Sequence, residues 1–155
     1  MTRAEPGLYR TTQSLTGYTM ADPTPADEEW ARANLPVGVE TRGEHCITAE
    51  QAERGYLPVV EALGEGMCRT TRFDVDGDRL DAAVACEETG GTTLQFSLAL
   101  TAGATSSRME SRVVQSGERV PGKRLELVRL SESERIGECP TPPPPQAAPA
   151  QLPPG

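Results

Sequence analysis

The sequence predicts a mainly β protein, an antiparallel meander that forms a curved sheet or partly open barrel with one to three short helices and two disulfides. The first observation is the stretch from residue 92 to 101, where apolar side chains alternate with polar or small ones. This period of two is typical of a strand with one buried face. Its apolar members are Leu94, Phe96, Leu98 and Leu100. The second observation is a set of glycine-containing turns spaced as hairpins require.

Pairing across the turn at Thr89-Gly90-Gly91 continues the apolar face into the preceding strand. The predicted pairs are Cys86 with Leu94, Val84 with Phe96, Ala82 with Leu98, and Leu80 with Leu100. The next turn, at residues 102–105, places Leu98 against Met109 and Leu94 against Val113. Agreement between successive turns and strands indicates one sheet with a single apolar face.

The turn at Asp76-Gly77 allows two registers for the hairpin between Cys68 and Cys86. A two-residue turn sets Phe73 against Leu80 but leaves Cys68 one residue out of register with Cys86. A three-residue turn aligns the cysteines but sets Phe73 against Asp81. We favour the apolar register, with a bulge or strand end near Cys68 that supplies the slip.

In either register Cys68 and Cys86 lie at the same end of one hairpin, so they are predicted to form a disulfide, which leaves Cys46 to pair with Cys139. The second bridge would close a loop of roughly 90 residues, for which chain entropy predicts more than about 4 kcal/mol. The alternative is four buried free thiols in a cytosolic protein. Two disulfides would instead place the protein in an oxidising compartment.

The remaining elements follow from strand composition and capping signals. Strands are expected at residues 7–19 and, after a type II turn at 120–123, at residues 125–130. A helix should begin at Thr24-Pro25, carry Trp30 and stop before Pro36. A second should open with the capping box at residues 48–51, and residues 38–44 should form a loop or an edge strand. We expect residues 1–5 to be disordered, one domain over residues 6–139, and a disordered, proline-rich tail over residues 140–155.

Composition excludes several functions. The chain has 155 residues, a formal net charge of −8 and a single lysine, so it is not expected to bind nucleic acid. No apolar run approaches the ~18 residues of a transmembrane segment. The first ten residues lack the apolar region of a signal peptide. The protein is therefore either cytosolic, or its export signal is absent from this sequence.

No catalytic residue, metal ligand or cofactor site is predicted. An EF-hand counted from Asp74 fails, because its sixth and twelfth positions hold Arg79 and Ala85 instead of glycine and glutamate. His45 is the only histidine and is assigned to the surface or to packing, since the neighbouring Cys46 is expected to be bridged. Carboxylate pairs such as Glu28-Glu29 are solvated charges.

The apolar strip of the sheet is the remaining candidate site. It could form a ligand-binding face, although such strips more often form a protein core. Its members are Phe73, Leu80, Val84, Leu94, Phe96, Leu98, Leu100 and Met109.

Several short motifs occur together in one order. The first is Pro6-Gly7-Leu8-Tyr9, which opens the first strand. The second is a C-I-T-x-E-Q-A segment from residue 46 to 52, and the Cys68–Cys86 hairpin follows it. The last is R-I-G-E-C at residues 135–139, which closes the domain. Over residues 6–139 this order resembles domain-of-unknown-function family 3617, which consists of small exported bacterial proteins. Tyr9 stands where tryptophan is usual. The resemblance implies a location in the periplasm or at the cell surface, and it implies no activity and no catalytic residues.

We therefore expect a non-enzymatic exported or envelope-associated module that binds a protein or an apolar envelope molecule through its sheet. The alternative is an inhibitor of a basic secreted hydrolase, for which an acidic, disulfide-bonded β domain is electrostatically suited. An enzyme that uses carboxylates alone ranks third.

Overall fold

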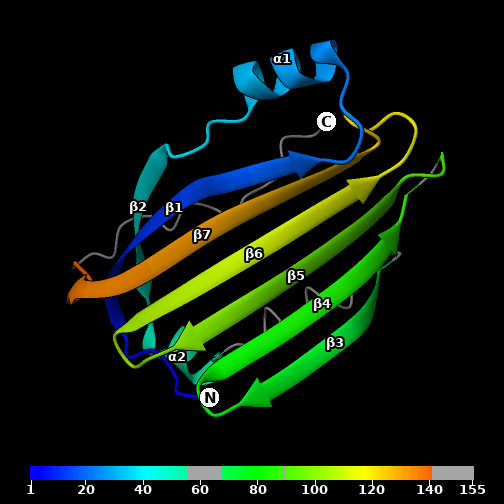
Figure 1. Ribbon diagram of the computed structural model, residues 1–155. Coiled ribbons are helices and arrows are strands. Elements are labelled where there is room, and N and C mark those ends of the chain that lie inside the picture. Colours follow the sequence, from blue (N-terminus) through cyan, green and yellow to red (C-terminus); the bar gives the residue numbers. More distant parts are fainter. Residues whose placement is uncertain (56–67, 89, 141–155) are drawn as a thin grey trace.

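The computed structural model describes residues 1–55, 68–88 and 90–140, and shows one seven-stranded antiparallel sheet with two helices (Figure 1). This confirms the predicted fold class. The elements are β1 (Gly7–Met20), α1 (Pro25–Asn34), β2 (Glu40–Ile47), α2 (Ala49–Arg54), β3 (Cys68–Asp76), β4 (Arg79–Glu87), β5 (Thr93–Ala102), β6 (Ser106–Ser116) and β7 (Arg124–Gly137). No helix among the described residues is long and apolar enough to cross a membrane.

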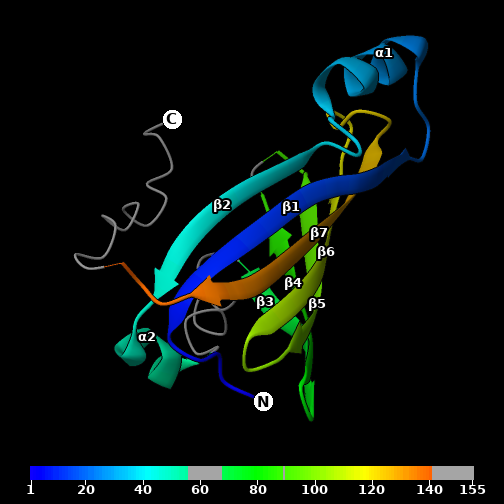
Figure 2. The ribbon, with the colours of Figure 1, turned by 90° about the vertical axis from the view of Figure 1, so that its left-hand side faces the viewer.

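The strand order is β2-β1-β7-β6-β5-β4-β3, so the sheet is open, with β2 and β3 as its edges. Strands β3 to β7 form a meander, in which each strand pairs with the next along the chain. The first strand breaks this order, because β1 pairs with β7 and brings the two ends of the domain together. The sheet is strongly bent, and α2 lies on its concave side (Figure 2).

The pairing of β4 with β5 has the predicted register, including Leu80 opposite Leu100. The predicted register of β5 with β6 is wrong by two residues, because Leu98 lies opposite Ser111. Pairing persists to Ala102 opposite Ser107, and the loop is closed by the Gly103 N–H, which donates to the Ser106 carbonyl at 2.7 Å. A shift of two residues leaves the same side chains on the same face.

The β3–β4 hairpin differs from both predicted registers near its turn. Its two-residue loop is Gly77-Asp78, and Phe73 lies opposite Ala82. Gly77 has a φ of 59°, the conformation that a glycine at the first loop position accepts without strain. The predicted bulge is confirmed between Thr70 and Arg72, and it brings Cys68 opposite Cys86.

The other elements agree with the sequence patterns. The predicted N-cap Thr24 and the predicted capping box at Thr48 are confirmed, and Thr24 forms a capping box with Asp27 as well. Residues 40–47 form an edge strand, and β7 extends beyond the predicted residues 125–130. At the type II turn, the Lys123 N–H donates to the Val120 carbonyl at 2.8 Å and Gly122 has a φ of 67°.

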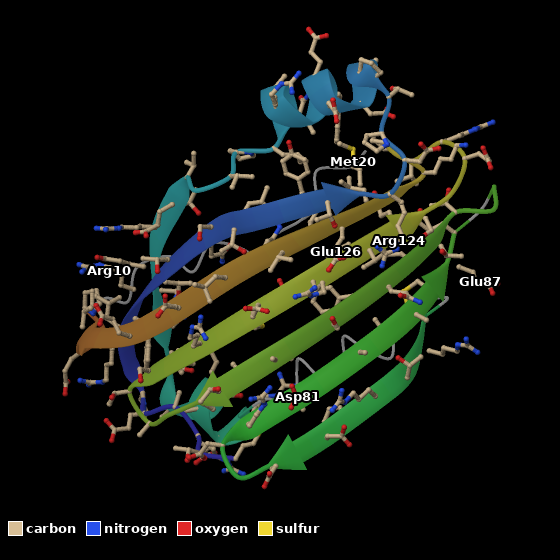
Figure 3. All side chains as sticks on the ribbon, viewed as in Figure 1. Arg10, Met20, Asp81, Glu87, Arg124 and Glu126 are labelled. Carbon is tan, nitrogen blue, oxygen red and sulfur yellow. A yellow bond between two sulfur atoms is a disulfide. The ribbon has the colours of Figure 1, made fainter. Side chains whose placement is uncertain are left out.

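The two faces of the sheet differ in chemistry. The face that carries the hydrophobic core has Leu80, which is 1% exposed, together with Ala82, Leu98 and Leu100. The convex face, turned to the viewer in Figure 3, carries arginines and carboxylates such as Arg10, Asp81, Arg124 and Glu126. Their ion pairs are mostly exposed, so they solvate this face and add little stability. The pairs include Arg10–Glu44 at 3.5 Å, Arg79–Asp81 at 2.9 Å and Arg124–Glu126 at 3.7 Å.

Candidate functional site

The predicted apolar strip lies on one face and is largely packed. Leu80, Val84, Leu98 and Leu100 are buried. Phe96 and Met109 pack against the core cluster, and Leu94 is half-buried. Phe73 alone is exposed, at 43%, because it lies on the edge strand β3. The buried members have little surface to offer a ligand in this structure.

The disulfides pair as predicted, Cys46 with Cys139 and Cys68 with Cys86. Cys68–Cys86 links two directly opposed residues of neighbouring strands. Cys46–Cys139 links the edge strand β2 to the segment after β7, which are separated by β1 in the sheet. The second bridge therefore ties three strands together at one end of the sheet.

A cavity of about 170 Å³, which we call the histidine cavity, lies at this same end. It lies between β1, β2, α2, β7 and the β5–β6 loop. It is lined by Ala4, Tyr9, His45, Ile47, Gln51, Ala52, Gly55, Gly103, Ser106, Ser107 and Ser133. Tyr9 belongs to the first sequence motif, and Ile47, Gln51 and Ala52 belong to the second. Segments that are far apart in the chain therefore meet around one cavity.

Tyr9 forms the inner wall of the cavity and is only 2% exposed. Its hydroxyl donates towards two carbonyl oxygens, those of Glu5 at 2.8 Å and Ala104 at 3.1 Å. Burial raises the pKa of the phenol, Arg135 opposes this shift, and Glu5 adds to it. Tyr9 therefore stays neutral, and it holds the N-terminal segment against the β5–β6 loop.

His45 lies opposite Tyr9 in the β1–β2 pairing, and the two rings are stacked. Their centroids are 6.0 Å apart and their planes differ by 27°. His45 is exposed, and its imidazole forms no hydrogen bond with a described residue. The ring is thus oriented by packing against Tyr9 while its nitrogens remain available to a ligand or to water.

Helix α2 completes the wall, and its position follows from its N-terminus. The Thr48 hydroxyl accepts from the Gln51 N–H at 3.2 Å, and the Gln51 side-chain oxygen accepts from the Thr48 N–H at 3.0 Å. This capping box starts the helix two residues after Cys46, which the bridge to Cys139 fixes. Gln51, Ala52 and Gly55 are thereby held against the cavity.

Among the residues that the structure describes, the cavity lining includes no carboxylate, lysine or arginine. Its polar groups are hydroxyls, one amide and the imidazole. Within the described parts of the chain, no group of three histidine, cysteine, aspartate or glutamate side chains is placed to hold a metal ion. The arrangement is suited to hydrogen bonding with a neutral molecule.

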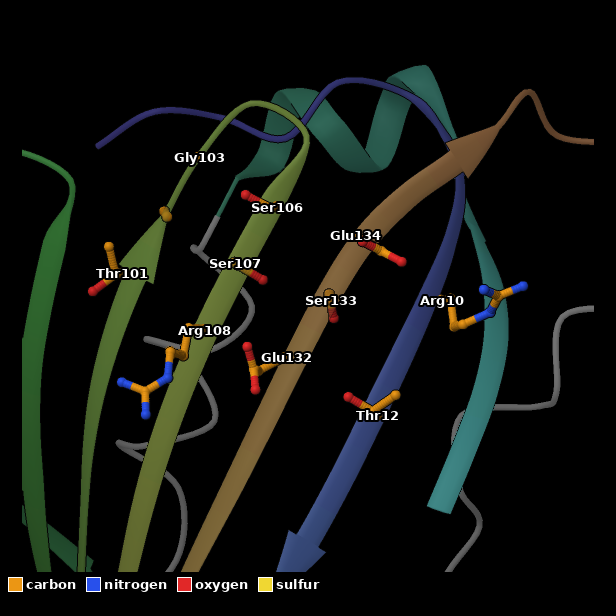
Figure 4. Close-up of a pocket in the computed structure, with 11 residues that line it drawn as sticks. Arg10, Thr12, Thr101, Gly103, Ser106, Ser107, Arg108, Glu132, Ser133 and Glu134 are labelled. Carbon is orange, nitrogen blue, oxygen red and sulfur yellow. The ribbon is translucent and has the colours of Figure 1, made fainter. Parts of the chain in front are cut away.

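A larger hollow of about 540 Å³, the charged hollow, lies at the same end of the sheet (Figure 4). It shares Gly103, Ser106, Ser107 and Ser133 with the histidine cavity, and its other walls include Arg10, Arg108, Glu132 and Glu134. Arg108 is opposite Glu132 and Arg10 is opposite Glu134 in the strand pairing. The hollow thus continues the alternating charges of the convex face, which are adequately explained by solvation.

Sequence reasoning missed the histidine cavity, because it treated His45 in isolation. The signal that could have found it was the pair of motifs at residues 6–9 and 46–52, which contribute Tyr9, Ile47, Gln51 and Ala52 to its lining. A third motif, at residues 135–139, lies next to them without lining the cavity. A disulfide between Cys46 and Cys139 requires the last two of these motifs to meet. What the motifs could not show was the pairing of β1 with both β2 and β7.

These features define a small disulfide-bonded protein built on one open, curved antiparallel sheet. A family model, described as a protein of unknown function (DUF3617), matches residues 4–139. The chain belongs to this family. No curated protein and no solved structure matches it.

Proposed function

We propose that this protein is a non-enzymatic binding module, exported to the periplasm or the cell surface, which takes its ligand at the histidine cavity. The observation that carries the proposal is the meeting of two motif segments, at residues 6–9 and 46–52, with Ser133 of β7 around one cavity. Apolar packing alone does not require solvent-accessible hydroxyl, amide and imidazole groups to gather at one place.

The proposed compartment is supported by the cysteines. All four are bridged, and disulfides persist in oxidising compartments. The bridge from Cys46 to Cys139 also supports the cavity, because it holds α2 beside β1 and β7. Export would thus supply the conditions in which the site is assembled.

A binding role, rather than a catalytic one, is supported by how the titratable groups are placed. A general base is normally oriented by a hydrogen bond from a third group. His45 is instead oriented by ring stacking, and the Tyr9 hydroxyl is committed to two carbonyls. Neither arrangement activates a nucleophile.

The proposal can be tested with protein that is directed to the periplasm of a bacterial host and purified with both disulfides intact. Native mass spectrometry should find a bound small molecule, and its occupancy should fall in His45→Ala. The matched control is Arg42→Ala, which removes an exposed side chain of the same strand. Ligand-free protein from several envelope extracts, or equal occupancy in both variants, would reject the proposal.

Inhibition of a basic secreted hydrolase is a second candidate, supported by the net charge of −8. Helix α1 adds to this support, because its first turn carries Asp27 and Glu28 and its Trp30 is 40% exposed. Micromolar protein should then slow a cationic hydrolase such as lysozyme, and Trp30→Ala should relieve the inhibition. Unchanged lysozyme turnover would count against this function.

A further inference from the structure

The histidine cavity restricts the charge of what it can hold. None of the described side chains that line it carries a fixed charge. A charged ligand group that enters such a site loses part of its hydration, and the described lining offers it no carboxylate, ammonium or guanidinium group in return. The lining therefore favours a neutral ligand.

The volume restricts the size of the ligand. Cavities that enclose a drug-sized molecule have volumes of about 300–1,000 Å³. The histidine cavity, at about 170 Å³, is smaller. It is suited to one small unit, either free or at the end of a longer molecule.

The polar groups of the lining restrict the chemistry of the ligand further. The Ser106 and Ser107 hydroxyls and the His45 imidazole form no hydrogen bonds with described residues. A serine hydroxyl both donates and accepts, as does a neutral imidazole. These groups are complementary to a ligand whose own groups also donate and accept at closely spaced positions. Sugar hydroxyls do this around a whole ring, whereas a peptide presents only one amide per residue.

The stacked rings add a flat surface. The His45 ring lies against buried Tyr9, so its orientation is set before any ligand arrives. A preorganised planar ring can pack against the C–H face of a sugar, an interaction that is weak but directional. Preorganisation reduces the entropy lost when the ligand binds.

From these observations we infer that the histidine cavity binds a single neutral sugar unit, either free or at the end of a glycan. The inference rests on the proposed binding function and specifies its ligand class. Ser106, Ser107 and Gln51 supply hydrogen bonds, and His45 supplies the stacking surface.

The experiment uses the full chain labelled with ¹⁵N, with both disulfides formed, and follows amide chemical shifts during titration. The probes are glucose, its anionic analogue glucuronate, and a terminally blocked alanine dipeptide. At about pH 7.5, glucose should shift the amides of Tyr9, His45 and Ser107 with a Kd on the order of 1 mM. The two other probes should bind at least about tenfold more weakly.

Two variants locate the site. Ala52→Leu should fill the cavity and weaken glucose binding at least about tenfold, whereas Ala33→Leu, on exposed α1, should leave it unchanged. Ser107→Ala removes one hydroxyl without filling space and should weaken binding about fivefold. Thermal unfolding of each variant confirms that it is folded.

The inference is overturned if glucose shifts no cavity amide, if a charged sugar or the dipeptide binds as well as glucose, or if Ala52→Leu binds like Ala33→Leu. A different molecule released from the cavity in native mass spectrometry would overturn the sugar assignment while leaving the proposed binding function intact. If neither experiment finds a ligand, both the sugar assignment and the proposed binding function are rejected.

Discussion

The two halves of the sheet are held together in different ways. Strands β3 to β6 form successive hairpins around Leu80, Ala82, Leu98 and Leu100, and their disulfide joins cysteines 18 residues apart. Strands β2, β1 and β7 come from opposite ends of the domain, and their disulfide joins cysteines 93 residues apart. The first half joins strands that are neighbours along the chain, whereas the second joins strands that are distant in the chain.

This difference accounts for where the cavity lies. Hairpins that pack an apolar face leave little space for polar groups. Where distant segments meet, loops and helix α2 bring hydroxyls, an amide and an imidazole together, and the cross-link supplies stability that dense packing provides elsewhere. The proposed binding site therefore lies in the half that long-range strand pairing brings together.

The largest expected effect is the loss of the long-range disulfide. By chain entropy, Cys46→Ser with Cys139→Ser should lower the free energy of unfolding by about 4–5 kcal/mol, and Cys68→Ser with Cys86→Ser by about 3 kcal/mol. Urea denaturation of the two double variants measures both values. A greater loss of unfolding free energy for the Cys68–Cys86 variant would show that the long-range disulfide is not the more stabilising of the two.

Truncation of the core comes next. Leu80→Ala removes a side chain that is only 1% exposed, and it should cost about 2–4 kcal/mol through lost burial and a residual cavity. Phe73→Ala, on the same face but 43% exposed, should cost less than about 1.5 kcal/mol. Urea denaturation measures both losses of unfolding free energy. Equal losses would show that burial of Leu80 contributes no more to stability than the partly exposed Phe73.

The third effect concerns the Tyr9 hydroxyl, in the half formed by β2, β1 and β7. Tyr9→Phe leaves the ring in place but removes its hydrogen bonds to the Glu5 and Ala104 carbonyls, which should cost about 1–2 kcal/mol. Tyr18→Phe is the matched control on the same strand, where the expected change is close to zero. If Tyr9→Phe has no larger effect than this control, the hydroxyl does not hold the N-terminal segment in place.

The smallest effect is on pH dependence, through the contact between α1 and the β6–β7 turn. The Asp27 carboxylate accepts from the Thr24 N–H at 2.9 Å and the Gly122 N–H at 3.1 Å. The hydrogen bond from the Thr24 backbone is the largest cause of its lowered pKa. A lowered carboxyl pKa gives stability that is present above the unfolded pKa of about 3.9 and is lost as the pH falls through the folded value.

Asp27→Asn should therefore flatten the pH dependence of the unfolding free energy below about pH 4. Urea denaturation at several acidic pH values measures the slope in both proteins. An unchanged slope would show that this carboxylate does not link α1 to the turn. A direct NMR titration of the Asp27 side chain supplies an independent reading of the same pKa.

The sequence allowed much of the fold to be predicted, because its strongest signals are local. Alternation placed Leu94 to Leu100 on one face, and a bulge was required to align Cys68 with Cys86. The predicted loop positions of the β3–β4 and β5–β6 hairpins were wrong by one or two residues. The backbone conformation at Gly77 and the closure between Gly103 and Ser106 depend on how the whole strands pair. The histidine cavity was not predicted, because its walls come from segments with no local signal for their contact.

The sequence by itself determined the β meander, the capped helices and both disulfide pairings, since turns, alternation and capping act over a few residues. Only the tertiary structure decided that β1 lies between β2 and β7, and that His45 stacks on Tyr9 beside α2. These arrangements depend on which distant strand edges satisfy one another's hydrogen bonds. That choice is made by the whole sheet, and no short segment encodes it.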